Sequence, residues 1–112
     1  MRFIRLRTIL AALLLMILAF ACAPSLLAAD DSASTFKDDC STCHGVDGSG
    51  TDIGRKLQAP DLRSKRVQSQ TDAQLFAAIK NGKGQMPPHK DLLTDAQIKQ
   101  LVKYVRTLAT KK

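Results

Sequence analysis

Two cysteines and a histidine stand together in the segment Cys40-Ser41-Thr42-Cys43-His44. Residues three apart on a helical turn lie on one face, so both thiols can reach the two vinyl groups of one porphyrin and add across them as thioethers. This C-x-x-C-H spacing is the attachment pattern of haem c. His44 then stands where its imidazole can point at the iron as the proximal ligand. Because the motif occurs once, the sequence predicts one haem c, bound covalently through Cys40 and Cys43.

Three other interpretations of these cysteines stay open from the sequence. An exported chain permits a structural disulfide, although a gap of two residues is tight for one. A redox pair like that of thioredoxin belongs between a strand and a helix, and no strand pattern surrounds the motif. A zinc site needs more ligands, and beyond His44 the segment 30–112 offers only His89.

Met86 is the candidate for the second axial position of the iron. It lies in a loop from Asn81 to Pro88, where two glycines let the backbone turn away from a preceding helix. Pro87 forces Met86 toward an extended conformation, which holds the thioether on a stiff segment. The predicted metal ligands are therefore His44 and Met86. The alternatives are that Met86 is an ordinary core residue, that His89 ligates instead, or that the iron stays five-coordinate. If it is not a ligand, His89 is expected to be a solvated loop histidine.

The first 29 residues have the organisation of a secretory signal peptide. Three arginines precede an uncharged stretch, small residues follow, and cleavage is expected near Ala29. If it is not cleaved, residues 9–29 are long enough to anchor the chain in a bilayer; alternatively, Cys22 would be lipidated as in a lipoprotein signal. Each interpretation places the mature domain, residues 30–112, in the periplasm or otherwise exported, with a membrane attachment only in the last two.

Residues 30–112 are poor in apolar side chains for a self-sufficient core. Nearly half of the hydrophobic residues of the chain lie in the leader, and the aromatic residues after it are Phe36, Phe76 and Tyr104. A segment of this size forms one domain, and small domains often need a metal, a disulfide or another staple. A bound haem would supply the missing apolar volume.

The charge of residues 30–112 is mildly positive, with 14 Lys and Arg against 10 Asp. Such an excess favours encounters with acidic protein surfaces. The basic residues do not form a stripe interleaved with aromatic residues, so nucleic acid is excluded as a partner.

Helical signals dominate the rest of the chain. Thr71-x-x-Gln74 and Thr94-x-x-Gln97 are capping boxes, and they predict helices from Thr71 to Asn81 and from Thr94 to Leu108. Residues 98, 101, 102, 105 and 108 of the second helix form one apolar stripe. The segment 32–40 has modest helical character, residues 45–70 show no sustained period, and no strand pattern occurs. The sequence therefore predicts an all-α domain.

Four segments resemble the class I cytochromes c, the small monohaem electron carriers of bacterial periplasms and of respiratory or photosynthetic chains. They are Phe36 to Gly45, Ala59 to Leu62, Gly82 to Pro87 and Leu93 to Leu108, in the order and at the spacing of that family. The resemblance implies a cytochrome c fold of three to four short helices and long loops, wrapped around one covalently attached haem.

The resemblance also implies roles for individual residues. Phe36 would pack against the last helix near Tyr104, and the carbonyl of Pro60 would accept the second ring N–H of His44. The porphyrin would be lined by apolar side chains, namely Leu62, Leu75, Ile79 and Leu101. Arg55 and Lys56 are the cations expected to meet the haem propionates.

The function that the resemblance implies is one-electron transfer between redox partners, not an enzymatic reaction. The partners would be an oxidase, a reductase or a dehydrogenase with an acidic docking face, and the chain is expected to be a monomer. Some of Lys37, Lys80, Lys83 and Lys90 are expected to rim the haem edge. The alternative is a haem peroxidase or small-ligand sensor with a labile or open sixth position.

Overall fold

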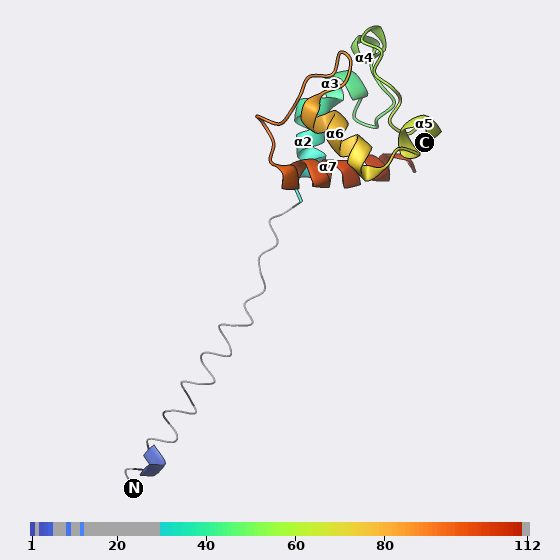
Figure 1. Ribbon diagram of the computed structural model, residues 1–112. Helices are drawn as coiled ribbons and strands as arrows, with labels where there is room; N and C mark the ends of the chain where they lie inside the picture. The colour runs from blue at the N-terminus through green and yellow to red at the C-terminus, as the bar shows by residue number, and fades with distance from the viewer. Residues whose placement is uncertain (2, 6–8, 10–11, 13–29, 111–112) are drawn as a thin grey trace.

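The computed structural model describes residues 1, 3–5, 9, 12 and 30–110 of the chain (Figure 1). The expected cleavage point at Ala29, the candidate lipid site Cys22 and most of the segment 9–29 lie outside these residues. Within the described part, no helix has the length and apolar character needed to cross a bilayer.

One helical run carries the chain from Ser32 into the cysteine motif. It consists of α2 (Ser32–Thr35), the π-helical turn η1 (Phe36–Cys40) and α3 (Ser41–His44). The helix expected over 32–40 is therefore present, and it continues through the whole motif. Single π-turns inside α-helices are rare and occur often at functional sites, and this one ends on Cys40.

The segment 45–70 contains two short helices. They were not predicted, because the segment shows no sustained hydrophobic period. They are α4 (Asp52–Lys56) and α5 (Lys65–Gln68). Each begins at a hydroxyl cap, because the Oγ atoms of Thr51 and Ser64 accept hydrogen bonds from the backbone N–H groups of Gly54 and Val67. A helix of four or five residues is too short to show a hydrophobic period, and the cap was its only local signal.

The two helices predicted from capping boxes are confirmed. They are α6 (Asp72–Asn81), capped by Thr71 and Gln74, and α7 (Asp95–Leu108), capped by Thr94 and Gln97. In both, the side chain and backbone of the box residues bond reciprocally. The helix α6 ends at Gly82, whose φ of 76° suits a residue without a side chain.

The core lies where α7 meets the rest of the domain. The five stripe residues of α7 are all buried. Figure 1 shows α7 running across both α2 and α6, which it contacts. The rings of Phe36 and Tyr104 pack with centroids 5.1 Å apart, so the expected aromatic contact is confirmed. The described residues form helices and loops with one isolated bridge, between Lys83 and Met86, which confirms the all-α class.

Candidate functional site

The cysteine motif forms a single turn that is anchored from outside the helix. The Oγ1 of Thr51 donates a hydrogen bond of 2.6 Å to the carbonyl of Thr42, and its backbone N–H reaches the carbonyl of Cys43 at 3.2 Å. The N–H of Gly50 donates to the carbonyl of His44 at 2.7 Å. These bonds satisfy carbonyls that a helix end leaves without partners, and they fix the backbone of the turn that carries the two thiols and the imidazole.

The helix α4 lies directly against this turn. A Cβ atom placed on Gly54 would stand 1.9 Å from the carbonyl oxygen of Cys43, so only glycine allows this approach. The helix α4 therefore packs closely against the backbone of the cysteine motif.

His44 is buried, and its imidazole is held in the neutral form. Burial lowers the pKa of His44 below its ordinary value, the carbonyl of Pro60 partly opposes this, and the charge of His89 lowers it further. The Nδ1 atom of His44 is enclosed and has no hydrogen-bond partner. The carbonyl of Pro60 is nevertheless near enough to act on the pKa of the ring. At neutral pH the ring therefore carries a free nitrogen lone pair, as an iron ligand must.

The thiols do not have the properties of a disulfide or of a redox-active pair. Cys40 and Cys43 are both free and half-buried. Burial, and then the charge of Asp39, raise the pKa of Cys40 to about 11, so this thiol is protonated at neutral pH. A thioredoxin-like cysteine needs a pKa lowered toward neutrality. No group of three or more metal-binding side chains exists among the described residues, which gives no support to a zinc site.

Met86 lies in the segment 82–93, here called the Met86 loop. Met86 and Lys83 exchange two backbone hydrogen bonds of 3.0 and 3.1 Å, which close a tight turn. The loop is then tied to the end of α6, because the N–H groups of His89 and Lys90 donate to the carbonyls of Ile79 and Lys80 at 3.1 Å. The half-buried Met86 side chain is thus carried by a loop fixed at both ends.

Two glycines of the Met86 loop give a matched pair of variants. Both have positive φ, 76° at Gly82 and 60° at Gly84, but a Cβ at Gly82 would lie 2.6 Å from the carbonyl of Met86 whereas one at Gly84 meets nothing within 4 Å. We expect Gly82→Ala to displace Met86 and to cost about 2 kcal/mol or more of unfolding free energy, and Gly84→Ala to cost about 1 kcal/mol. Urea titration followed by circular dichroism measures both, and equal losses would contradict the role of this contact.

His89 is buried, with 8% of its surface exposed, which corrects the expectation of a solvated loop histidine. Its Nδ1 atom is enclosed and has no hydrogen-bond partner. His89 lowers the pKa of His44 electrostatically, so the Met86 loop and the cysteine motif lie near each other, as Figure 1 also shows. Nothing in the polar composition of the loop indicated this burial.

Pro60 and Leu62 approach the motif from the segment between α4 and α5. Leu62 is buried, and its N–H donates to the carbonyl of Gly48 at 2.8 Å. It belongs to the same apolar cluster as Leu75 and Leu101, against which Ile79 also packs. The four apolar residues expected around a porphyrin therefore belong to one cluster.

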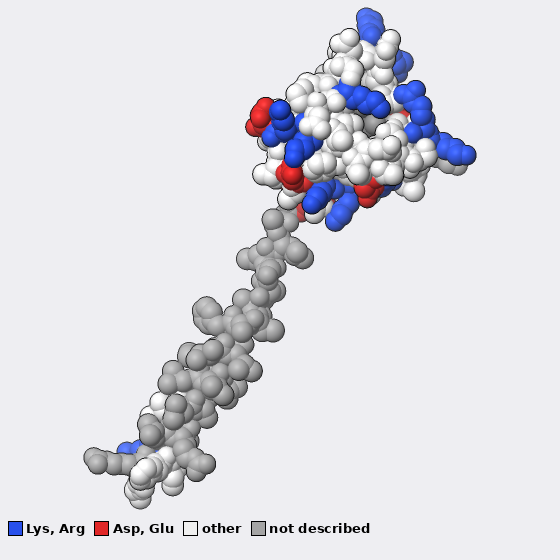
Figure 2. Space-filling model, viewed as in Figure 1, with Lys and Arg blue, Asp and Glu red and all other residues white. Residues whose placement is uncertain are grey.

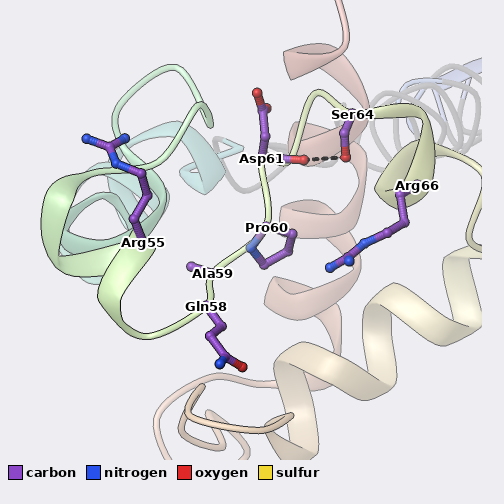
Figure 3. Close-up of a pocket in the computed structure, with 7 residues that line it drawn as sticks. All are labelled: Arg55, Gln58, Ala59, Pro60, Asp61, Ser64 and Arg66. Atoms are coloured by element: carbon purple, nitrogen blue, oxygen red, sulfur yellow. Dashed lines mark hydrogen bonds between the residues drawn. The ribbon is translucent and has the colours of Figure 1, made fainter.

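A cavity of about 400 Å³ lies beside Pro60 (Figure 3). It is lined by Arg55, Gln58, Ala59, Pro60, Asp61, Ser64 and Arg66. The side chain of Arg66 extends toward Pro60, whereas that of Arg55 points away and pairs with Asp52. Lys56, one of the two cations expected at the propionates, does not line the cavity. Arg66 lines the cavity, and no sequence pattern singled it out, because the helix α5 that carries it is too short to show a hydrophobic period.

The residues present fit a covalent haem. Two free thiols lie on one anchored turn, a neutral imidazole follows them, and the carbonyl of Pro60 lies near enough to the His44 ring to act on its pKa. Cations stand on the Pro60 side, where negatively charged propionates would be accommodated.

Comparisons with known proteins agree with this chemistry. Residues 27–105 match the family described as cytochrome C oxidase, cbb3-type, subunit III. Cytochrome c6 of Euglena gracilis is 31% identical over 77 residues, which cover 69% of this chain and 88% of that protein.

Solved structures give the same result. The structure described as the KustC0563 c-type cytochrome matches with a TM-score of 0.66 and 35% identity, covering 70% of this chain and 96% of that one. A point mutant of Kustc0563 matches with a TM-score of 0.65 and 36% identity, covering 70% and 98% of the two chains.

Proposed function

The chain belongs to the class I c-type cytochromes, which carry covalent haem c and transfer electrons, and we propose that it does so with His44 and Met86 as the two axial ligands of the iron. The observation that carries this proposal is the pairing of a buried, neutral His44 with a methionine loop that is fixed at both ends and lies near it. When bound, haem supplies the ferric and ferrous states between which one electron is exchanged.

The chain's own residues then set how easily that electron moves. The anchored turn and the Met86 loop hold imidazole and thioether in place, so the protein need not rearrange when the charge changes. A hydrogen bond to Pro60 would fix the His44 tautomer and raise its basicity. The surrounding apolar cluster disfavours the additional positive charge of the ferric state and so raises the potential.

A spectroelectrochemical titration of the purified protein tests the function. We expect one reversible transition that fits a single electron, with the absorption and magnetic circular dichroism signature of a low-spin iron bound to nitrogen and sulfur. A ferric spectrum with two nitrogen ligands, or a high-spin iron at neutral pH, would contradict the proposed ligation.

We also propose that the domain works outside the cytosol, because haem attachment to such a motif and the leader-like residues 1–29 are both typical of exported proteins. Intact mass spectrometry of the protein from its own host tests this. The mass should equal residues 30–112 plus one haem. A mass including residues 1–29 would mean an anchor, and one beginning at Cys22 with added acyl chains would mean a lipoprotein.

The redox partners are expected to present acidic faces. Of the four lysines expected at the haem edge, Lys80 is engaged, because it forms a 2.9 Å ion pair with Asp95. Lys37, Lys83 and Lys90 are exposed. Further cations occupy α4 and α5, namely Arg55, Lys56, Lys65 and Arg66, and Figure 2 shows Lys and Arg gathered over this part of the visible face.

Charge reversal in the Met86 loop should slow electron exchange with an acidic partner. Lys83 contacts Met86 through the backbone, so Lys83→Glu places a negative charge next to the proposed ligand. We expect the second-order rate at low salt to fall about tenfold, and added salt to slow the wild type. Lys103→Glu on α7, beside Asp30, is the control with the same change of charge. Stopped-flow rates that are indifferent to salt, and that are no slower in Lys83→Glu than in Lys103→Glu, would contradict electrostatic steering.

A further inference from the structure

His89 is the one buried imidazole that the proposed ligation does not use. It is more than nine-tenths buried, and its enclosed Nδ1 has no partner among the described residues. A polar atom that is buried without a hydrogen bond destabilises the folded state. The backbone of His89 has its hydrogen bonds satisfied, since its N–H donates to the carbonyl of Ile79 and its carbonyl accepts from the N–H groups of Leu92 and Leu93. The unsatisfied group is therefore the side chain alone.

Two prolines restrict the backbone between Met86 and His89. Pro88 and Pro87 each favour extended conformations at the preceding residue, and no peptide bond in the described part is cis. Extended backbone of the polyproline type has three residues per turn. We therefore expect Met86 and His89, three residues apart, on the same side of the segment.

His89 also lies close to His44. It acts electrostatically on His44, and both imidazoles are buried. The Met86 loop therefore carries an unpartnered imidazole near the proposed proximal ligand, three residues after the proposed methionine ligand.

We propose that His89 is a substitute sixth ligand, which binds the iron when the Met86 thioether is lost. The inference rests on the proposed ligation by His44 and Met86 and extends it. The imidazole must advance to reach a position that Met86 occupies, so loss of the thioether must be accompanied by a movement of the Met86 loop. An imidazole is a common protein ligand of haem iron, whereas a lysine ammonium group has no lone pair to offer.

Spectra of holoprotein variants test the proposal. Ferric Met86→Ala should be low-spin at neutral pH, with two nitrogen ligands by electron paramagnetic resonance and magnetic circular dichroism. Met86→Ala combined with His89→Leu should be high-spin. Added imidazole, which must displace His89 in the first variant, should bind at least about tenfold more tightly in the second. Met86→Ala combined with Lys83→Ala is the matched control and should stay low-spin.

A high-spin Met86→Ala protein would overturn the proposal, as would a double variant that stays low-spin without His89. The proposed function has a separate readout in His89→Leu alone, which should keep the nitrogen and sulfur ligation of the wild type. If His89→Leu alone changes the axial ligands of the iron, His89 is the ligand of the wild-type protein. The proposed ligation by Met86 and the substitute role of His89 would then both be wrong.

Discussion

Met86→Ala is expected to lower the midpoint potential by on the order of 0.2 V while the haem stays attached. Axial ligands set haem potentials over a range of about 0.8 V, and a thioether favours the ferrous state more than nitrogen or water does. The thioether bonds to Cys40 and Cys43 are independent of Met86, so the covalent mass should be unchanged. Equilibrium redox titration gives the potential, and denaturing mass spectrometry gives the attachment.

The exposed neighbour Gln85 provides the control, because it belongs to the same turn and is not a proposed ligand. Gln85→Ala should leave the potential within a small fraction of the Met86→Ala change. A potential that is unaffected by Met86→Ala would remove Met86 from the iron.

Loss of both thioether bonds should largely unfold the domain. The buried hydrophobic side chains that the structure describes number nine, which is a small core for a segment with so many charged residues. A small domain gains only marginal stability from such a core. We therefore expect Cys40→Ala combined with Cys43→Ala, freed of haem, to show a disordered far-ultraviolet spectrum and no cooperative thermal transition.

Thr42→Ala is the matched control within the same turn, since Thr42 is exposed and forms no thioether. It should keep haem and fold cooperatively. A haem-free double variant that still unfolds in one sharp transition would show that the polypeptide core suffices, contrary to the composition argument.

The long helices could be predicted from the sequence because their signals are local. Thr71 with Gln74 and Thr94 with Gln97 mark helix starts by hydrogen bonds within three residues, and the apolar stripe of α7 fixes its buried face. The cysteine motif is equally local, since the spacing of its residues alone places them on one turn.

The features that sequence reasoning missed depend on distant contacts. The burial of His89 follows from the attachment of the Met86 loop to α6. Composition alone predicts that a polar side chain in such a loop is exposed. The helix α5, and with it the position of Arg66, is supported by long-range bonds, because Gln68 donates to the carbonyl of Val105 and Arg106 to that of Gln68. Hydrophobic periodicity reflects only residues three or four apart, so it does not reveal contacts between residues this distant in the sequence.

Carbon monoxide added to the ferrous protein at neutral pH shows whether the sixth position of the iron is closed. An iron bound by both His44 and Met86 has no free position, so we expect an absorption spectrum that carbon monoxide leaves unchanged over minutes. Rapid formation of a carbon monoxide complex would show an open or labile sixth position. The chain would then be a ligand-binding or peroxidase-like haem protein, and the assignment as a His44 and Met86 electron carrier would be wrong.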